Sequence, residues 1–343
     1  MRKLLNTLFV TTEDAYLALE NENVVVLREE EKLGQYPLQV LENIVLFSYK
    51  GASPALMGAC AARDIHLCFL TPNGRFLARV CGESRGNVLL RKAQYRISDD
   101  PAKSCRIARN MIFGKIFNSR WVLERTLRDH ALRVDAQRLS DAAAQLQRRL
   151  EEIRQIEELD TLRGAEGVAS AAYFGVLDQL ILNQKDAFYF DGRNRRPPRD
   201  RVNAALSMTY TLLAHDCASA LEGVGLDAYV GFMHRDRPGR ASLALDLMEE
   251  LRAPLADRFV LTLINTRVLQ QKHFKTQADG AVWLSEEGRK ALLSAWQNRK
   301  KEEITHPYLK EKMPWGLVPY VQSLLLARTL RGDLDGYPPF LWK

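Results

Sequence analysis

The stretch Ile65–Tyr95, IHLCFLTPNGRFLARVCGESRGNVLLRKAQY, contains the change of pattern that decides the fold. It opens with two β-type runs, Ile65–Leu70 and Arg75–Val80, joined by Pro72-Asn73-Gly74. Asn and Gly tolerate the positive φ angles of a tight hairpin turn, so this is a hairpin signal. After Arg85 the apolar residues take the spacing of a helix, beginning with 87–95. The stretch predicts that a β-rich part ends here and a helical part begins.

More β-type runs precede this stretch, and turn formers separate them. The runs are Thr7–Val10, Ala15–Leu19, Val24–Leu27 and Ile44–Phe47. A second hairpin turn is expected at Asn21-Glu22-Asn23, and one small helix at 54–63 should pack on the strands. We therefore predict an N-terminal β-rich domain over residues 1–86.

Helical periodicity continues toward the C-terminal end of the chain. From Pro101 to about Leu132, apolar side chains fall on one helix face, namely Ile107, Met111, Phe117 and Trp121. Further helices are expected over 136–156, 161–182 and 202–221, where good helix formers dominate. The second domain, residues 87–343, is thus predicted to be mainly α-helical, and the fold class to be α+β.

Two segments of the second domain are predicted to lack helix. Residues 191–201 contain two prolines among crowded arginines, which predicts an exposed basic loop. Residues 332–343 mix turn formers with aromatic residues, and we expect this tail to extend over a surface.

Length and composition place the chain among ordinary globular proteins. It has 343 residues, of which 46% are hydrophobic and 27% charged, so a disordered, collagen-like or disulfide-stapled chain is excluded. The five cysteines are odd in number and form no CxxC pair, which predicts reduced core thiols; they are Cys60, Cys68, Cys81, Cys105 and Cys217. The first residues lack the pattern of a signal peptide and no window approaches the roughly 18 apolar residues of a membrane span, so we expect a cytoplasmic protein with no membrane partner.

Basic residues are concentrated in the middle of the chain. Residues 1–74 contain six basic and nine acidic side chains, whereas residues 75–128 contain thirteen and four, a local charge of +9 against +7 for the whole chain. This charge run is either a solvated helix face or a ridge that tracks phosphates. The candidate nucleic-acid-binding residues lie in this run and in the basic loop: Arg85, Arg91, Lys92, Lys103, Arg106, Arg109, Arg193, Arg195, Arg196 and Arg199.

The helical part also carries a histidine and several carboxylates that could form a site. Glu166 lies near the start of an apolar helix with small residues on both sides. His234 ends the run 228–234 and precedes a turn, which would present the imidazole at the end of an element. Leucines repeat every four residues over 243–251 and place Asp246, Glu249 and Glu250 on the flank of that helix.

Each of these residues has an ordinary explanation. A glutamate early in a helix favours the positive end of the dipole, a histidine after an apolar run is often a hydrogen-bonded core residue, and paired acids often form a wet helix face. Together, however, carboxylates that converge with a histidine repel one another unless a divalent cation neutralises them. Oxygen ligands with one imidazole suit Mg²⁺ or Mn²⁺ better than a structural zinc. The other histidines are interpreted as packing or surface residues: His66, His130, His215, His273 and His306.

At this point the sequence resembles a known family, the CRISPR-associated integrases of spacer acquisition. The resemblance rests on five segments in order, namely Phe69–Val80, Gly86–Tyr95, the Glu166 helix with Tyr173-Phe174, Val202–Leu213 and Gly231–Arg252. It spans nearly the whole chain. The run 86–90 and the tail 332–343 look most similar to members of subtype I-C.

The resemblance implies site residues at three positions. The family's metal ligands, a Glu, a His and a second acidic residue, fall on Glu166, His234 and Glu249, and Asp246 takes the neighbouring acidic position among the catalytic residues. Many members have Asp where this chain has Glu249, a side chain longer by one carbon.

The resemblance also implies an activity and partners. It implies a DNA endonuclease and integrase, dependent on Mg²⁺ or Mn²⁺, that joins the 3′-hydroxyl ends of short foreign DNA to a CRISPR repeat by transesterification, for antiviral defence. The implied partners are DNA, a second copy of the chain through the β-rich half, and a small companion CRISPR-associated protein, with Tyr337–Trp342 as a candidate contact. Two alternatives stay open: a metal-dependent nuclease that acts on branched DNA or RNA in repair, and a basic DNA-binding protein without catalysis.

Overall fold

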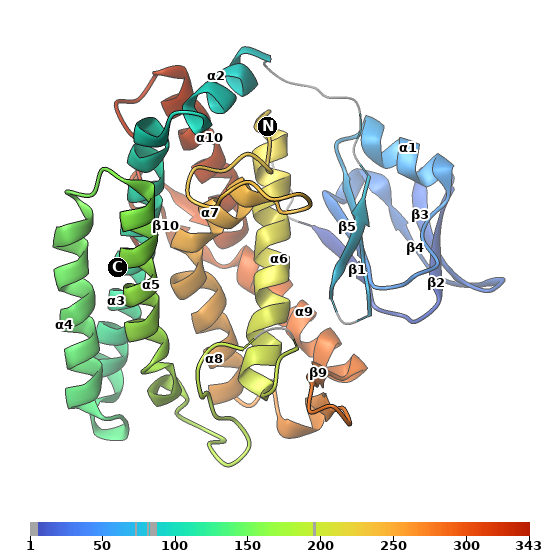
Figure 1. Ribbon diagram of the computed structural model, residues 1–343. Helices are drawn as coiled ribbons and strands as arrows, with labels where there is room; N and C mark the ends of the chain where they lie inside the picture. Colours follow the sequence, from blue (N-terminus) through green and yellow to red (C-terminus); the bar gives the residue numbers. More distant parts are fainter. Residues whose placement is uncertain (1–5, 73, 81, 83–87, 195–196) are drawn as a thin grey trace.

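The computed structural model of this chain describes residues 6–72, 74–80, 82, 88–194 and 197–343. Strands dominate up to Arg79 and helices dominate from Val88 onward, so the predicted α+β class is confirmed (Figure 1). The β-rich part lies to one side of the helical part. The predicted boundary at 86 and 87 falls outside the described residues, and the division into two domains stays a prediction.

Two sheets form the β-rich part. In the first, with strand order β1-β5-β6-β7, the pairs β1/β5 and β5/β6 are parallel and β6/β7 is antiparallel. In the second, β2, β3 and β4 form an antiparallel meander, of which β4 was not predicted because its exposed, charged sequence lacks a β-type run. The bounds are β1 (Thr7–Val10), β2 (Ala15–Glu20), β3 (Asn23–Arg28), β4 (Glu31–Pro37), β5 (Asn43–Leu46), α1 (Pro54–Ala62), β6 (His66–Leu70) and β7 (Phe76–Arg79).

Both predicted hairpins are confirmed. Strands β2 and β3 pair across a turn in which Asn21 and Glu22 have φ angles of 48° and 62°. Strands β6 and β7 pair across the turn that contains Gly74, whose φ is 82°, although Asn73 lies outside the described residues. A positive φ at these positions is the conformation that Asn and Gly tolerate best.

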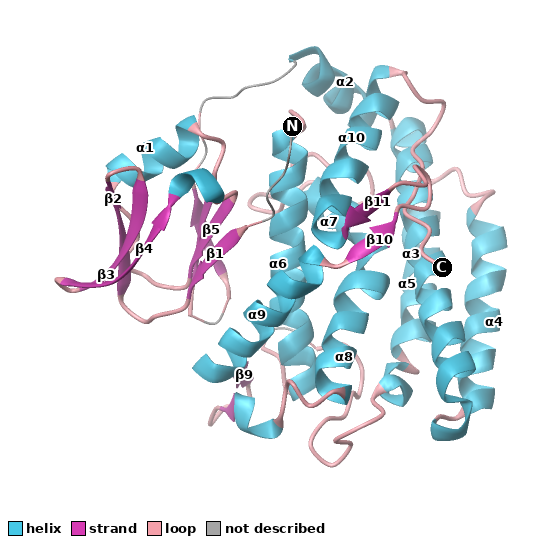
Figure 2. Cartoon of the chain, turned by 180° about the vertical axis from the view of Figure 1, so that it is seen from behind, coloured by secondary structure: helices cyan, strands magenta, loops and turns pink. Residues whose placement is uncertain are grey.

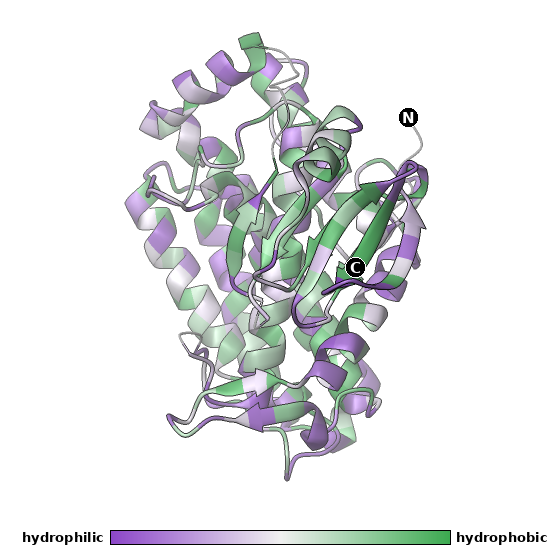
Figure 3. Cartoon of the chain, turned by 90° about the vertical axis from the view of Figure 1, so that its right-hand side faces the viewer, coloured by the Kyte–Doolittle hydropathy of each residue, from purple (hydrophilic) through white to green (hydrophobic). Residues whose placement is uncertain are grey.

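The first sheet contributes to two separate cores. Along β5, Ile44 and Leu46 pack in a core with the second sheet and α1, whereas Val45 joins the core of the helices. Along β6, Leu67 and Cys68 divide in the same way. Successive side chains of a strand point to opposite faces, so this alternation lets one sheet bind the β-rich part to the helices. In Figure 3, where the β-rich part faces the viewer, several of its strands are largely apolar.

The helical part is built from nine described helices. Asp100 caps α3 by accepting from the N–H groups of Ala102 and Lys103 at 3.1 Å, and Asp200 caps α6 through the N–H of Asn203. The bounds are α2 (Val88–Ser98), α3 (Pro101–His130), α4 (Ala136–Ile153), α5 (Leu159–Phe174), α6 (Arg201–Gly223), α7 (Ser242–Leu251), α8 (Arg258–Asn265), α9 (Glu286–Lys301) and α10 (Val318–Arg331). Two short hairpins, β8 (Phe274–Thr276) with β9 (Val282–Leu284) and β10 (Glu303–Thr305) with β11 (Lys312–Pro314), complete it.

Several predicted helix limits need correction. The helix expected over 161–182 ends at Phe174, and a short 3₁₀ helix follows at Leu177–Leu180. Helices α8, α9 and α10 were not predicted. Helix α9, for example, is largely charged, and it depends on the Ser285 cap and on the burial of Trp296 rather than on a long apolar stripe.

Helix α7 runs directly into a π-helical turn at Arg252–Asp257. Pro254 lies in this turn and has no N–H to donate, so the regular α-helical ladder cannot continue through it. Helix α8 then resumes at Arg258. The turn brings Arg252 next to the last residues of α7.

The C-terminal tail does not extend over a surface as predicted, because its aromatic side chains are buried. Tyr337, Phe340 and Trp342 are 2%, 0% and 9% exposed and belong to the core of the helices. Asn118 of α3 donates to the carbonyl of Phe340 at 2.7 Å and accepts from the N–H of Trp342 at 2.8 Å. The end of the chain therefore lies along α3, as seen from behind in Figure 2. These aromatic rings are unavailable as the expected partner contact.

The remaining predictions about buried residues are mixed. The four described cysteines are buried free thiols, as expected, and Cys81 lies outside the described residues. His306 is fully buried and hydrogen-bonded to Gln322, and burial lowers the pKa of His215 to about 4, so both are packing residues. None of the helices in the described ranges is long and apolar enough to span a membrane.

Candidate active site

Glu166 lies on the second turn of α5 and faces Lys115 of α3. Its Oε1 accepts a hydrogen bond from the hydroxyl of Ser170, one turn further along the helix, at 2.7 Å, and it forms an ion pair with the Lys115 ammonium. A Cβ added at Gly164 or Gly167 would meet no atom within 4 Å. The small residues around Glu166 therefore border open space, rather than letting a second element of the chain pack closely.

Glu249 comes from α7 and meets the same ammonium. Its Oε2 lies 2.7 Å from Lys115 Nζ, while Arg252 Nη1 lies 3.0 and 3.1 Å from its two oxygens. Burial alone would raise the pKa of this carboxyl, but Arg252 and then Lys115 lower it to about 2. Glu249 is thus an ionised carboxylate held between two cations.

His234 is fixed by Asp246, a fully buried residue of α7. The Asp246 carboxylate accepts from three consecutive backbone N–H groups, those of residues 232–234, and lies 2.6 Å from His234 Nδ1. Burial disfavours a charged imidazole, but the hydrogen bond and charge of Asp246 raise the pKa of His234 above its usual value. This contact occupies Nδ1 and leaves Nε2 as the nitrogen for a ligand.

The position of Asp246 changes its predicted role. Asp246, Glu249 and Glu250 are 0%, 7% and 0% exposed, so the alternative of a wet helix face is wrong. Asp246 does not line the pocket; it lies behind His234 and orients it. We therefore describe it as a positioning residue.

Glu166, His234 and Glu249 line one pocket of about 260 Å³. The other side chains around this pocket are Ile112, Met233 and three arginines, Arg163, Arg235 and Arg240. Arg163 is anchored by two hydrogen bonds to the Met233 carbonyl, at 2.9 and 2.7 Å. A pocket lined by both carboxylates and guanidinium groups suits a phosphate and its counterion.

Sequence reasoning missed five of the basic residues in and around this pocket. Arg235 and Arg240 lie in the turn that follows His234, and Arg163 lies three residues before Glu166, so proximity to the predicted ligands was a usable signal. Lys115 and Arg252 gave no such signal, because their partners come from distant helices or depend on the π-helical turn.

The residue types of this donor set suit the divalent ion that the sequence implies, although their spacing in this structure is too wide for one ion. Two carboxylates and one imidazole nitrogen face the same pocket, and the imidazole is oriented by a buried carboxylate, the outer support that metal-binding histidines usually have. Within the described residues, no three His, Cys, Asp or Glu side chains are grouped closely enough to bind one ion. Lys115 lies between the two glutamates in this structure.

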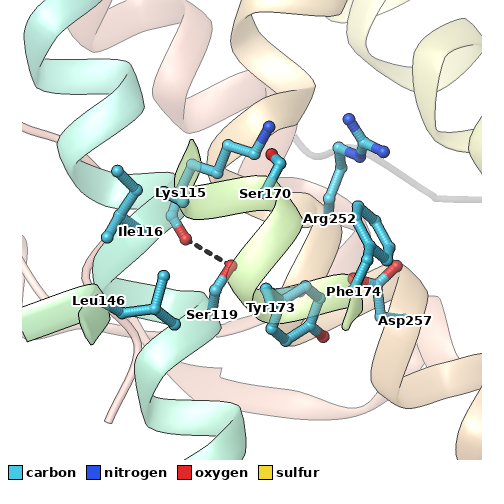
Figure 4. Close-up of a pocket in the computed structure, with 11 residues that line it drawn as sticks. Lys115, Ile116, Ser119, Leu146, Ser170, Tyr173, Phe174, Arg252 and Asp257 are labelled. Carbon is cyan, nitrogen blue, oxygen red and sulfur yellow. Dashed lines mark hydrogen bonds between the residues drawn. The ribbon is translucent and has the colours of Figure 1, made fainter. Parts of the chain in front are cut away.

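A second cavity, of about 10 Å³, is lined by side chains that also contact the two glutamates (Figure 4). It is lined by Lys115, Ser170 and Arg252 together with apolar side chains, and by Asp257. The Arg252 guanidinium stacks over the ring of Tyr210 at 4.4 Å, and the Tyr210 hydroxyl donates to Asp257. These contacts hold Arg252, which in turn holds Glu249.

The candidate residues for nucleic-acid binding divide into exposed and structural ones. Lys92, Lys103, Arg106 and Arg199 are exposed, with Lys103 paired to Asp100 at 2.9 Å. Arg91 and Arg109 are partly buried and donate to backbone carbonyls, of Gly225 and of Arg154 and Ile156. Arg85, Arg195 and Arg196 lie outside the described residues.

Arg193 was predicted to bind nucleic acid from an exposed loop, but its side chain is half-buried in this structure. Its guanidinium donates to Asn203 and Ser207 of α6 and stacks on Tyr210 at 5.1 Å. The group is turned into the protein, so Arg193 holds the loop on α6.

Comparison with known proteins identifies the family of this chain. Residues 8–298 match the family model described as CRISPR associated protein Cas1. The chain is 52% identical to CRISPR-associated endonuclease Cas1 2 of Rhodospirillum rubrum and 46% identical to CRISPR-associated endonuclease Cas1 1 of Chlorobaculum tepidum, each over 100% of both chains.

Solved structures share the fold at low sequence identity. A Cas1 protein from Thermotoga maritima has a TM-score of 0.79 at 20% identity, over 95% of this chain and 97% of that one. A casposase bound to its integration product has a TM-score of 0.82 at 20% identity, over 98% and 94%. The family match and the full-length relatives together show that this chain belongs to the Cas1 family of CRISPR-associated endonucleases.

Proposed function

We propose that this Cas1 endonuclease inserts short DNA fragments into a CRISPR array, with the chemistry at the pocket of Glu166, His234 and Glu249. The observation that carries the assignment of the site is the meeting of these three side chains, from α5, the 228–241 segment and α7, around one pocket with an arginine wall. A divalent ion, Mg²⁺ or Mn²⁺, bound there would polarise the scissile phosphate and stabilise its developing charge.

The residues of the chain itself supply the rest of the site. Asp246 orients His234 so that Nε2 faces the ligand, and Arg252 keeps Glu249 ionised. Arg163, Arg235 and Arg240 line the same pocket and would offer guanidinium groups to phosphate oxygens. The attacking 3′-hydroxyl replaces one ester bond by another, so the step needs no covalent link between enzyme and DNA.

The partners are part of the same proposal. The exposed cations Lys92, Lys103, Arg106 and Arg199 would contact the DNA backbone without reading its sequence. A second copy of the chain, a small companion CRISPR-associated protein, a cytoplasmic location and subtype I-C remain predictions from the sequence. A casposase of the same fold is bound to its DNA product, which supports the DNA partner.

Strand transfer tests this function. A short duplex, the companion protein and a supercoiled plasmid bearing a CRISPR repeat are combined with Mg²⁺, Mn²⁺ or EDTA, and joined products are scored for wild type, Glu166→Ala and His234→Ala. We expect joining that requires metal and is lost in both variants, while Glu151→Gln, a surface change on α4, joins as wild type does. Joining by Glu166→Ala at the wild-type rate would contradict the site. Cleavage of branched DNA or RNA without joining would favour a repair nuclease. Binding of DNA without metal, and without cleavage or joining, would favour a DNA-binding protein.

A further inference from the structure

The ammonium of Lys115 occupies the position between the two carboxylates of the site. It forms ion pairs with Glu166 and with Glu249, the second at 2.7 Å, and the Lys115 side chain is 8% exposed. Lys115 lies in the middle of α3, whereas the glutamates come from α5 and α7. One side chain of the protein thus provides the positive charge that draws three helices together at the site.

In this structure the charges of Glu166 and Glu249 are already balanced by two cations. Glu166 and Glu249 carry two negative charges, and Lys115 and Arg252 carry two positive ones. A divalent ion that binds both carboxylates adds two further positive charges within a few ångströms of the ammonium, and charges of the same sign repel strongly in a buried site. Lys115 and the ion therefore compete for the same carboxylate oxygens.

Of the two cations, Arg252 is the less suited to be displaced by a divalent ion. Its guanidinium contacts both oxygens of Glu249, stacks on Tyr210 and lies next to Asp257, and these neighbours fix it. Lys115 instead has a flexible four-carbon stem and borders the cavity of about 10 Å³, on the side of the Ser170 hydroxyl (Figure 4). Space of about one water molecule is available for its ammonium to move.

We propose that Lys115 is a resident counter-cation, which holds Glu166 and Glu249 together in the metal-free protein and is displaced when a divalent ion binds. The inference rests on the proposed metal site. Lys115 then has two opposite effects: it stabilises the empty site, and it weakens the binding of the ion. A lysine that merely supports the carboxylates would strengthen the binding of the ion instead.

Binding of Mn²⁺ to the DNA-free protein tests this, with free Mn²⁺ followed by electron paramagnetic resonance. We expect Lys115→Met to bind Mn²⁺ about tenfold more tightly than wild type, a change that corresponds to about 1.4 kcal/mol. Without metal, the same variant should unfold at a lower temperature, and saturating Mn²⁺ should raise its melting temperature more than that of wild type. Lys290→Met, which removes a surface lysine paired with Glu286, is the matched control and should match wild type in both measurements.

A second substitution covers the case in which Lys115→Met fails to fold. Lys115→Arg keeps the charge and pairs more firmly with carboxylates, so Mn²⁺ binding should weaken by about threefold or more. Weaker or unchanged binding in Lys115→Met, or tighter binding in Lys115→Arg, overturns the displacement. Failure of the site itself is distinguishable: Mn²⁺ binding that persists unchanged in Glu166→Gln and His234→Ala shows that the ion binds elsewhere. Absence of Mn²⁺ binding in wild type and Lys115→Met alike overturns both.

Discussion

The carboxylate of Asp246 lies 2.6 Å from Nδ1 of His234, with the Asp246 side chain fully buried behind the imidazole. The same carboxylate also accepts hydrogen bonds from three consecutive backbone N–H groups, so it is held in place against Nδ1, and Nε2 is the imidazole nitrogen left for a ligand. The orientation of His234, a proposed metal ligand, is thus set by a residue that does not line the pocket.

Asp246→Asn tests this relationship. An amide in place of the carboxylate presents an N–H₂ donor either to Nδ1 or to a backbone N–H, which disturbs the tautomer or the loop. We expect the rate of strand transfer and the Mn²⁺ affinity each to fall by about 10- to 100-fold. Asp333→Asn, which changes a surface partner of Arg331, should leave both unchanged. An Asp246→Asn protein with wild-type Mn²⁺ affinity would show that Asp246 serves the fold alone.

Glu250 makes a second prediction, concerning stability and pH. Burial raises the pKa of this carboxyl to about 7, although Tyr337, the Phe340 N–H and Gln322 donate to it. A carboxyl with a higher pKa in the folded than in the unfolded protein binds more protons when folded, so its contribution to stability is complete below about pH 4.5 and is lost as the pH rises through about 7.

The size of this effect is on the order of 3 kcal/mol. Urea unfolding of wild type at pH 5, 6, 7 and 8 should therefore show a free energy of unfolding that declines with pH in this window, beyond the decline in Glu250→Gln. Curves for the two proteins that run parallel would mean that Glu250 titrates normally. Glu222, on another helix, is a second test of the same sign, because burial raises the pKa of its carboxyl although Arg79 lowers it.

The buried tail makes a third prediction. Phe340 is fully buried, with its ring 5.5 Å from that of His306 and 5.6 Å from that of Trp315. Phe340→Ala should lower the free energy of unfolding by about 3–5 kcal/mol. Tyr308→Ala removes an aromatic ring that is 49% exposed and should cost far less. If chemical denaturation showed equal, small losses in the free energy of unfolding for both variants, the tail would lie on the surface, as the sequence pattern predicts.

Substitutions of Arg106 and Arg193 are expected to affect different properties, DNA affinity and stability respectively. Arg106 is exposed on α3, so Arg106→Ala should reduce the salt dependence of DNA affinity by about one unit of slope and leave stability almost unchanged. Arg193 donates to Asn203 and Ser207, so Arg193→Ala should instead lower the free energy of unfolding by about 1–3 kcal/mol. DNA affinity measured against salt concentration, together with urea unfolding, distinguishes the two. If Arg193→Ala instead reduced the salt dependence of DNA affinity and left the free energy of unfolding unchanged, Arg193 would be a DNA-binding residue.

The parts of the fold that the sequence predicted are those determined by local pattern. The two hairpins and the change from strands to helices follow from turn residues and from the spacing of apolar side chains, which act over a few residues. The tail was mispredicted because its burial depends on Asn118, more than two hundred residues earlier in the chain. A segment rich in Gly, Asp and Pro carries no local sign of such a contact.

The site also contains residues that the sequence predicted and residues that it did not. Glu166, His234 and Glu249 were predicted through a resemblance to a family, and their residue types already indicated an oxygen-rich metal site. The role of Lys115 could not be predicted from the sequence, because a lysine in a helix is ordinarily solvated. Only the packing of α3 against α5 and α7 buries it. The charge run that was expected to bind phosphates includes Lys115 itself, so net charge alone did not separate solvated from buried cations.

The pair of Arg252 and Glu249 provides the last prediction. Arg252 contacts both carboxylate oxygens of Glu249, and its own position depends on the π-helical turn and on Tyr210. Removing one partner of a buried ion pair leaves the other charge uncompensated, so Arg252→Met should lower the free energy of unfolding by about 3–5 kcal/mol. Arg252→Lys keeps the charge but not the two contacts and the stacking, and should fall between Arg252→Met and wild type.

A double-mutant cycle isolates the interaction from other effects of the substitution. In a Glu249→Gln background the carboxylate charge is absent, so the further change Arg252→Met should cost much less than it does in wild type, with a coupling free energy of about 1–3 kcal/mol. Arg267→Met, at an exposed residue beyond α8, should show no coupling to Glu249→Gln. If Arg252→Met costs the same in both backgrounds, Arg252 stabilises the protein through Tyr210 and Asp257 alone. The low pKa of Glu249 would then have to depend on Lys115, and Lys115→Met would raise it further than Arg252→Met does.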